Sequence, residues 1–233
     1  THQSLLPYLI EESYEFLNAA ESKSDFAMEE ELGDILLQVL LHATIGEQEN
    51  RFTLETVSKK LAEKLIRRHP HVFDKKDEKI DAEQVSKNWE KIKLEEKGQK
   101  NTSYIDTSIL NSPSLLSAYK IGKKTEKVGF DWEDYNQVSW KVEEEWQELK
   151  EELVPQKISI DRVEEEMGDF LFSAVQLARH LNLDPEKCLR NANKKFIKRF
   201  QKMEVLINQD GQNINDLNQK EMDIFWDEAK KGK

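Results

Sequence analysis

Two short acidic motifs occur in the same order twice along this chain. The first, Glu-Glu-x-x-Glu, stands at residues 11–15 and 144–148, and the second, Glu-Glu-x-Gly-Asp, at 30–34 and 165–169. On a helix, residues three or four positions apart share a face, so each motif presents two carboxylates to one side. A lone motif of this kind in an acidic helical protein is most often solvated surface. An ordered pair that is repeated favours a site instead.

The chemistry that such a pair allows is divalent metal binding. A short connection would make the two helices antiparallel neighbours, so that their carboxylates face each other. A cluster of this kind repels itself unless it holds a cation or protons. Oxygen ligands without Cys or His favour Mg²⁺, or Mn²⁺, over zinc, and such an ion can bind triphosphate oxygens and activate water. The carboxylates concerned are Glu145, Glu148, Glu166 and Asp169, with Glu12, Glu15, Glu31 and Asp34 as their first-repeat counterparts.

A di-iron four-helix bundle is the competing metal site. It requires Glu-x-x-His on two helices. None of His42, His69, His71 and His180 has a glutamate three residues before it. The sequence therefore excludes the di-iron site.

Basic and aromatic residues follow the second acidic pair. Lys194, Lys195, Lys198 and Arg199 gather on one helical stretch, either as a solvated face or as a phosphate-binding group beside a metal. Trp226 would stack on a base or lie in the core, and the sequence leaves both interpretations open.

Helical periodicity predicts the elements that position these residues, and no segment has the alternation of a strand. We therefore expect an all-α protein. N-caps at Ser24 and Thr53 and the Asp184-Pro185 start signal mark several helix beginnings. The expected helices are 5–21, one starting after Ser24, 53–68, 81–97, one opening at Ser112-Pro113, 135–153, 160–181, 185–208 and 218–230.

The repeat extends beyond the acidic motifs and divides the chain. Residues 64–68 recur as 195–199, and Trp89 recurs as Trp226, at a nearly constant offset. We expect a first domain at 1–97, a polar linker at 98–112 and a second domain at 113–233. Only the second repeat has a preceding helix and a Phe130-Asp131-Trp132 turn, so we expect the chain to begin inside its first domain.

Composition limits the function classes. Charged residues make up 35% and the net charge is −11, which disfavours non-specific binding to nucleic acid. The apolar runs are too short to span a bilayer, and no secretory leader is visible. The single Cys188 cannot form an intramolecular disulfide, which suits a reducing compartment, so we expect a cytoplasmic protein without membrane partners.

These motifs, in this order, resemble the MazG family of nucleoside triphosphate pyrophosphohydrolases. Residues 67–73 and 128–132 resemble its tandem form, in which two MazG domains are joined by a linker. The resemblance implies two all-α NTP pyrophosphatase domains, a homodimer and Mg²⁺ in the carboxylate cluster, with activity ascribed to the second domain. Small repeats of four or five helices also bury little surface alone, which independently favours a dimer.

The resemblance also implies roles for individual residues. The metal ligands would be Glu145, Glu148, Glu166 and Asp169, with Glu165 as a further catalytic carboxylate that also contacts nucleotide. The nucleotide would also contact Lys141, Arg162, Lys195, Arg199 and Trp226. The first repeat would contribute Glu12, Glu15, Glu31 and Asp34 as metal ligands, with Lys64, Arg68 and Trp89 beside them.

We accordingly expect an enzyme that hydrolyses NTPs or dNTPs to monophosphate and pyrophosphate. The alternative is a helical module that binds Mg²⁺–nucleotide or a partner without turnover.

Overall fold

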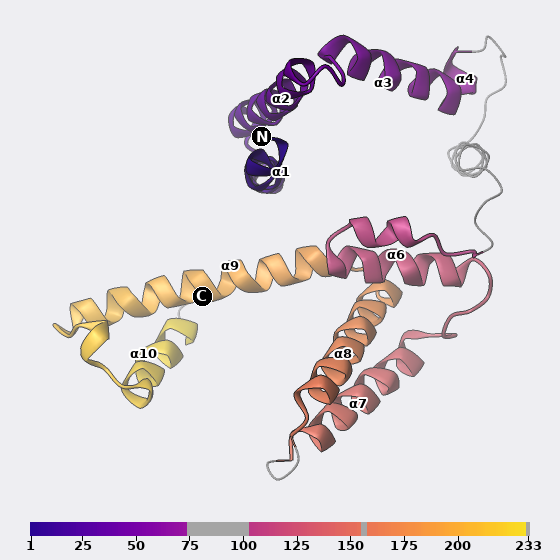
Figure 1. Cartoon of the computed structure of the whole chain (residues 1–233). Helices are drawn as coiled ribbons and strands as arrows, with labels where there is room; N and C mark the ends of the chain where they lie inside the picture. Colours follow the sequence, from indigo (N-terminus) through magenta and orange to yellow (C-terminus); the bar gives the residue numbers. More distant parts are fainter. Residues whose placement is uncertain (74–102, 155–157, 232–233) are drawn as a thin grey trace. The chain divides into compact units, whose positions relative to one another are not determined.

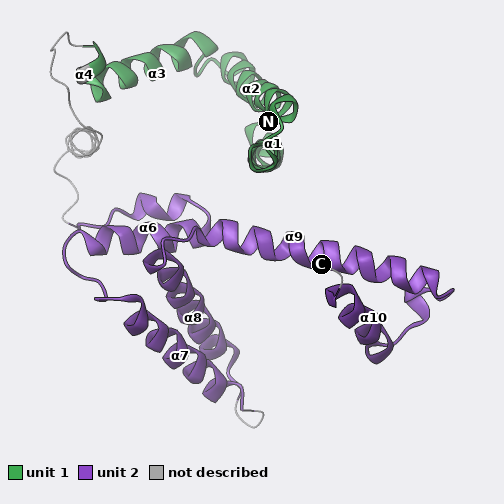
Figure 2. Ribbon diagram, turned by 180° about the vertical axis from the view of Figure 1, so that it is seen from behind, with its two compact units in different colours: residues 1–102 green, residues 103–233 purple. Residues whose placement is uncertain are grey.

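The computed structural model describes residues 1–73, 103–154 and 158–231. The chain forms two compact units, residues 1–102 and 103–233 (Figure 2). No strand occurs within these described ranges, which confirms the all-α prediction. None of the described helices is long and apolar enough to cross a membrane.

The first unit is built on an antiparallel helical hairpin, α1 (His2–Ser22) and α2 (Asp25–Gln48). Lys23 adopts a left-handed conformation with φ 56°, which ends α1, and the Ser24 hydroxyl then accepts a hydrogen bond from the Ala27 amide to begin α2. Thr53 caps α3 (Leu54–Arg68) in the same way, and a single turn, α4 (Pro70–Phe73), follows. This hairpin carries the first pair of acidic motifs.

The second unit contains a matching hairpin, α7 (Tyr135–Glu152) and α8 (Ile160–His180). Val138 and Leu149 of α7 are fully buried. The preceding helix α6 (Ser114–Glu126) lies against α8. Buried apolar side chains pack α7 against α8. The acidic motifs of the two helices therefore keep a fixed position relative to each other.

The last two helices of this unit form a separate layer. The long helix α9 (Pro185–Gln209) contacts α6 and α8 near its start and then runs away from the α7–α8 hairpin (Figure 1). After a short 3₁₀ turn, η2 (Ile214–Asp216), α10 (Gln219–Lys231) folds back on α9. Met203, Ile207 and Ala229 form the buried contact between them. The distal half of α9 is therefore stabilised by α10 and not by the hairpin.

The structure describes part of the expected linker and none of the expected fourth helix. A 3₁₀ helix, η1 (Thr107–Asn111), occupies part of the segment expected to be linker. The helix expected at 81–97 and Trp89 lie outside the described residues. The expected division of the chain into domains at 1–97 and 113–233, with a linker at 98–112, stays a prediction.

Candidate active site

Three carboxylates of the second repeat converge between α7 and α8. Glu145 and Glu148 come from α7 and Glu166 from α8, and each offers an oxygen within 4.8 Å of the others. The side chains of Glu145 and Glu166 are only 7% and 8% exposed, whereas Glu148 faces solvent. Asp169 lies one turn after Glu166 on α8 and is not part of this closest group. The arrangement places hard oxygen ligands where a divalent cation can reach them.

Two cations border this cluster, one from each helix. The Lys141 ammonium lies 2.9 Å from Glu144 and 2.8 Å from Glu145. Arg162 donates to Glu165 and Glu166 at 2.6 Å each and to Glu152 at 3.4 Å. Each buried carboxylate is thus paired on one side with a basic residue.

The neighbouring charges shift the pKa values of two groups at the cluster, Lys141 and Glu148. Hydrogen bonds and charge attraction from Glu145 and Glu144 raise the pKa of Lys141. Desolvation by the neighbouring groups, followed by repulsion from Glu145 and Glu166, raises the pKa of the Glu148 carboxyl, although Lys141 opposes this. Negative charge therefore remains in excess at the open side of the cluster, where an added cation would be attracted.

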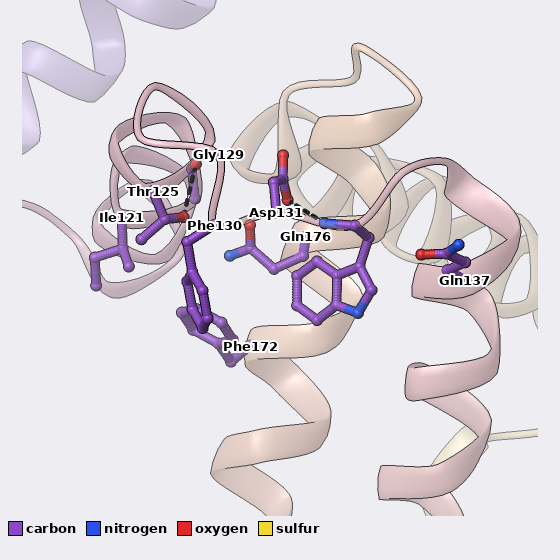
Figure 3. Close-up of a pocket in the computed structure, with 10 residues that line it drawn as sticks. Ile121, Thr125, Gly129, Phe130, Asp131, Gln137, Phe172 and Gln176 are labelled. Carbon is purple, nitrogen blue, oxygen red and sulfur yellow. Dashed lines mark hydrogen bonds between the residues drawn. The ribbon is translucent and has the colours of Figure 1, made fainter.

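A buried charge network, which the sequence motifs do not indicate, fixes the start of this unit. Arg179 of α8, 3% exposed, donates to Asp131 at 2.8 and 2.5 Å and to Glu126 at 3.3 Å. Burial alone would raise the pKa of Asp131, but hydrogen bonds from Arg179 and His180 lower it below its ordinary value. The signal for this network was a basic residue inside the apolar stripe of α8. Figure 3 shows Asp131 and Gln176 among the residues that line an adjacent cavity.

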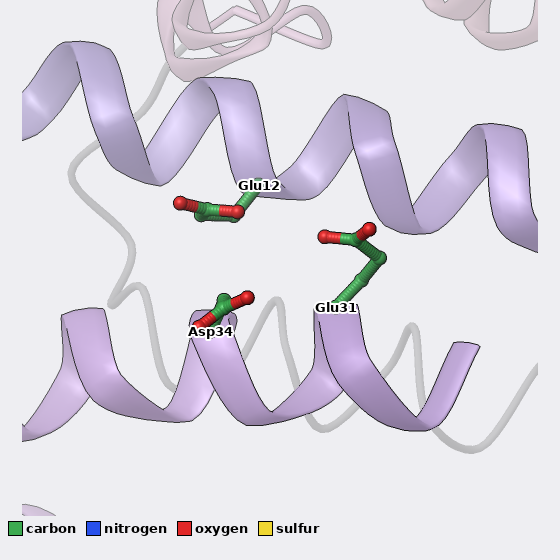
Figure 4. A group of neighbouring side chains, drawn as sticks. All are labelled: Glu12, Glu31 and Asp34. Atoms are coloured by element: carbon green, nitrogen blue, oxygen red, sulfur yellow. The ribbon is translucent and has the colours of Figure 1, made fainter. Parts of the chain in front are cut away.

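The first repeat forms a similar acidic cluster between α1 and α2. Glu12, Glu31 and Asp34 offer oxygens within 4.8 Å of one another, and their carboxylates face each other across the hairpin (Figure 4). Partial burial and repulsion raise the pKa values of Glu12 and Glu31. Glu15 contributes to the shift of Glu31 through a side-chain hydrogen bond. Three of the four expected carboxylates of this repeat thus form the closest group, and Glu15 lies near enough to Glu31 to affect its pKa.

The two clusters differ in their cations. The offset that aligns Glu12 with Glu145 places Tyr8 at the position of Lys141. The offset that aligns Glu31 with Glu166 places Ala27 at the position of Arg162. The first cluster therefore lacks both basic side chains that flank the second one, a difference that the acidic motifs alone did not reveal.

The remaining expected nucleotide contacts of the second repeat lie on the α9–α10 layer. Lys195 and Arg199 stand in the middle of α9 (Pro185–Gln209), and Figure 1 shows this helix running away from the α7–α8 hairpin. Trp226 of α10 packs against Phe196, with ring centroids 5.1 Å apart, and joins the α9–α10 core. Within one chain, the structure does not bring these three residues to the carboxylates of α7 and α8. In the first repeat, Lys64 and Arg68 lie on α3.

Comparison with known proteins gives two matches to one family. The family model of the MazG nucleotide pyrophosphohydrolase domain matches residues 1–73 and again 135–203. The chain is 48% identical, over its full length, to the nucleoside triphosphate pyrophosphohydrolase/pyrophosphatase MazG of Thermotoga maritima and covers 87% of it. It is 37% identical over 99% of its length to the nucleoside triphosphate pyrophosphohydrolase of Escherichia coli K12, covering 88%. Each family match contains one carboxylate cluster.

A further similarity reaches a longer protein. The chain is 45% identical over 99% of its length to the uncharacterized protein YabN of Bacillus subtilis, of which it covers 47%. The turn at 130–132 and Trp226 lie outside both family matches, although they belong to the same compact unit as the second cluster.

Proposed function

The chain belongs to the MazG nucleotide pyrophosphohydrolase family, and on that basis we propose that it hydrolyses nucleoside triphosphates to monophosphates and pyrophosphate. The observation that carries the proposal is the convergence of Glu145, Glu148 and Glu166 between two basic side chains. Such substrates belong to the nucleotide pool of the cell, and the only cysteine is free, which fits a cytoplasmic enzyme.

Mg²⁺ is the proposed cofactor of the second repeat. The donor set fits it, because three carboxylates within 4.8 Å supply only hard oxygens and Glu145 and Glu166 are buried with one cation each. Asp169 would serve as a fourth ligand from the next turn of α8. When bound there, Mg²⁺ would polarise phosphate oxygens and lower the pKa of a coordinated water.

The chain's own residues orient the triphosphate and accept a proton from the attacking water. Lys141 and Arg162 stand at the rim of the cluster, where they can bind phosphate oxygens with charge-assisted hydrogen bonds. A bound triphosphate would compete with Glu165 for Arg162. We assign Glu165, once released in this way, the role of the base that accepts a proton from the attacking water.

The second repeat is the proposed catalytic one. Its two cations bind phosphate, whereas the first repeat has Tyr8 and Ala27 at the same positions. The first cluster keeps the ability to bind a divalent ion but lacks these two groups for holding a triphosphate.

Pyrophosphate release tests the activity directly. The whole chain is incubated with each NTP, with Mg²⁺ or with excess EDTA, and the products are separated by ion-exchange chromatography. We expect NMP and pyrophosphate in equal amounts, only with the metal. Nucleotide binding without product would support the non-catalytic module instead, and release of orthophosphate would contradict this bond specificity.

We further propose a homodimer in which α9 and α10 of one protomer complete the site of the other. Lys195 and Arg199 lie on α9, and this helix runs away from the α7–α8 hairpin that carries the carboxylates of the same protomer. Large apolar side chains on α7, α8 and α9 stay exposed in one chain, and a two-helix layer of this kind needs a second layer to cover it. These side chains include Trp140, Trp146, Met167, Leu171, Leu189, Phe196 and Ile197.

Heterodimers distinguish a site shared between protomers from a site within one. Glu148→Gln and Arg199→Ala are each expected to be inactive as homodimers. If Arg199 acts on the partner's cluster, a heterodimer isolated through two affinity tags has one intact site and roughly half the wild-type activity. A heterodimer of Glu148→Gln with Glu166→Gln is the matched control and stays inactive. No activity in both heterodimers would place Arg199 in its own protomer's site, and sedimentation as a 27.4 kDa monomer would refute the dimer.

A further inference from the structure

Arg162, in the first turn of α8, donates from all three nitrogens of its guanidinium group. The two terminal nitrogens, Nη1 and Nη2, each lie 2.6 Å from a carboxylate of the same helix, Glu165 and Glu166 respectively. The inner nitrogen, Nε, lies 3.4 Å from Glu152, the last residue of α7. Of these three carboxylates, only Glu152 therefore reaches Arg162 from the other helix of the hairpin.

The contacts within α8 do not by themselves fix the direction of the guanidinium group. The side chains of Arg162 and Glu165 are 50% and 60% exposed, so this pair can move together into solvent. The Glu152 side chain is less exposed, at 29%, and it comes from a helix that packs along α8 (Figure 1). Because a guanidinium group is planar and rigid, a bond to Nε from this side directs both terminal nitrogens toward the carboxylate cluster.

The end of Arg162 that faces the cluster is the end that suits phosphate. Nη1 and Nη2 form a fork whose spacing matches two oxygens of one phosphate group. A triphosphate that displaced Glu165 would meet this fork in the correct direction. Less conformational freedom of the arginine would then be lost on binding, which increases affinity.

The first repeat replaces both members of this pair. The offset that aligns α1 with α7 places Ala19 at the position of Glu152, and Ala27 stands at that of Arg162. Where the arginine is missing, its partner on the other helix is missing too. This joint replacement is expected if the glutamate acts through the arginine. As a link between the helices the pair would matter less, because ion pairs exposed to this degree add little stability.

We propose that Glu152 is a positioning residue of the reaction, which orients Arg162 so that both terminal nitrogens face the phosphates of the bound nucleotide. The inference rests on the proposed function and adds to it a residue that touches neither nucleotide nor metal. At saturating nucleotide Arg162 is bound to phosphate with or without Glu152. Loss of Glu152 therefore weakens nucleotide binding and leaves the rate at saturation unchanged.

The test is the substitution Glu152→Ala, assayed with Mg²⁺ and an NTP that the wild type hydrolyses. KM should rise by about 3- to 10-fold, as for one partly exposed charge-assisted bond, while kcat stays within about twofold. The dissociation constant of the α,β-methylene analogue of that NTP, measured by calorimetry, should rise by the same factor without any turnover. Glu151→Ala is the matched control, since this neighbouring glutamate bonds to Gln147 instead, and it should match the wild type.

A double-mutant cycle separates positioning from a structural role. Arg162→Ala alone should raise KM by more than Glu152→Ala does, because it removes the phosphate contact itself. In the Arg162→Ala background, Glu152→Ala should then change KM by less than about twofold. Glu152→Gln keeps the side-chain length and an acceptor oxygen, so its KM should lie closer to the wild-type value than to that of Glu152→Ala.

Several results would overturn the assignment. An equal rise in KM with and without Arg162 would mean that Glu152 acts on the hairpin as a whole. A lowered kcat at unchanged KM, or values equal to those of Glu151→Ala, would exclude a role in nucleotide binding. Glu152→Gln as impaired as Glu152→Ala would remove the hydrogen bond as the cause. Failure of the proposed function gives a different result, because the wild-type chain would then release no pyrophosphate from any nucleotide.

Discussion

Gly122→Ala is the substitution for which the structure gives the clearest energetic prediction. Gly122 lies inside α6, where alanine would ordinarily stabilise a helix by about 1 kcal/mol. Here an added Cβ would stand 1.9 Å from the Gln176 amide oxygen and 2.5 Å from the Arg179 nitrogen. Neither neighbour can swing into solvent, because Gln176 is 0% and Arg179 3% exposed.

The expected cost combines overpacking with lost hydrogen bonds. Forcing a methyl group into a filled interior costs about 1–3 kcal/mol. Displacing Gln176 also breaks its bonds to Ala118 and Arg179, and each buried polar group left unpaired costs about 1–3 kcal/mol. After the helix-propensity gain, we expect Gly122→Ala to destabilise the second unit by about 2–4 kcal/mol.

Urea unfolding followed by tryptophan fluorescence measures this change. Four of the five tryptophans lie in residues 103–233, and one of them, Trp132, lines the cavity beside Gly122. Gly168→Ala is the matched control, since nothing lies within 4 Å of its added Cβ, and it should stabilise by about 0.5–1 kcal/mol.

A double substitution tests the stated cause. If the clash with Gln176 dominates, Gly122→Ala should cost less in a Gln176→Ala background than in the wild type. An unchanged or increased stability of Gly122→Ala in the wild-type background would refute the reasoning. It would mean that Gln176 and Arg179 can move aside for the added methyl group without cost.

Three further predictions concern the cluster and the buried network. Glu148→Gln and Asp169→Asn should each abolish pyrophosphate release while far-UV circular dichroism stays unchanged; a loss of helicity in both would make these carboxylates structural. Glu15→Gln should retain most of the activity that Glu148→Gln loses, and an equal loss in the two would assign turnover to both repeats. The hydrogen bonds of Asp131 lower its pKa in the folded protein, so its contribution to stability is present above the ordinary value of 3.8 and is lost as pH falls through the lowered value. Acid titration of the urea midpoint should show this loss in the wild type, and Asp131→Asn should lack that component and be less stable at pH 7.

Local sequence signals predicted the helices and the carboxylate positions well, because both depend on short-range rules. The Ser24 and Thr53 hydroxyls cap the helices that they were expected to begin. The three-residue spacing of Glu145 and Glu148, with a short loop to α8, placed them beside Glu166. These features follow from helical periodicity and from chain connectivity alone.

The features that the sequence did not predict depend on distant contacts. Arg179 and Asp131 are separated by 48 residues, and no periodic pattern connects them. The direction of α9 depends on a short connection after His180, in which Asn182 adopts a left-handed φ of 55° and Asp184 caps α9. These signals end one helix and begin the next, but they do not specify the angle between the two helices. Lys195 and Trp226 could therefore be assigned to a nucleotide by resemblance, whereas their distance from the carboxylates of the same chain became visible only in the structure.

The buried Arg179 decides where an isolated second repeat can be cut from the chain. The second family match begins at residue 135, but the partners Glu126 and Asp131 both precede it. A fragment starting at 135 would lose both carboxylates and also α6, which covers Arg179 and Gln176, so a face of α8 that is buried in the whole unit would be exposed to water. Such a fragment would have lost its cavity as well, since α6 and the turn form one wall of it. The smallest portion of this repeat able to fold alone therefore starts before Ser114, upstream of the border that family similarity suggests.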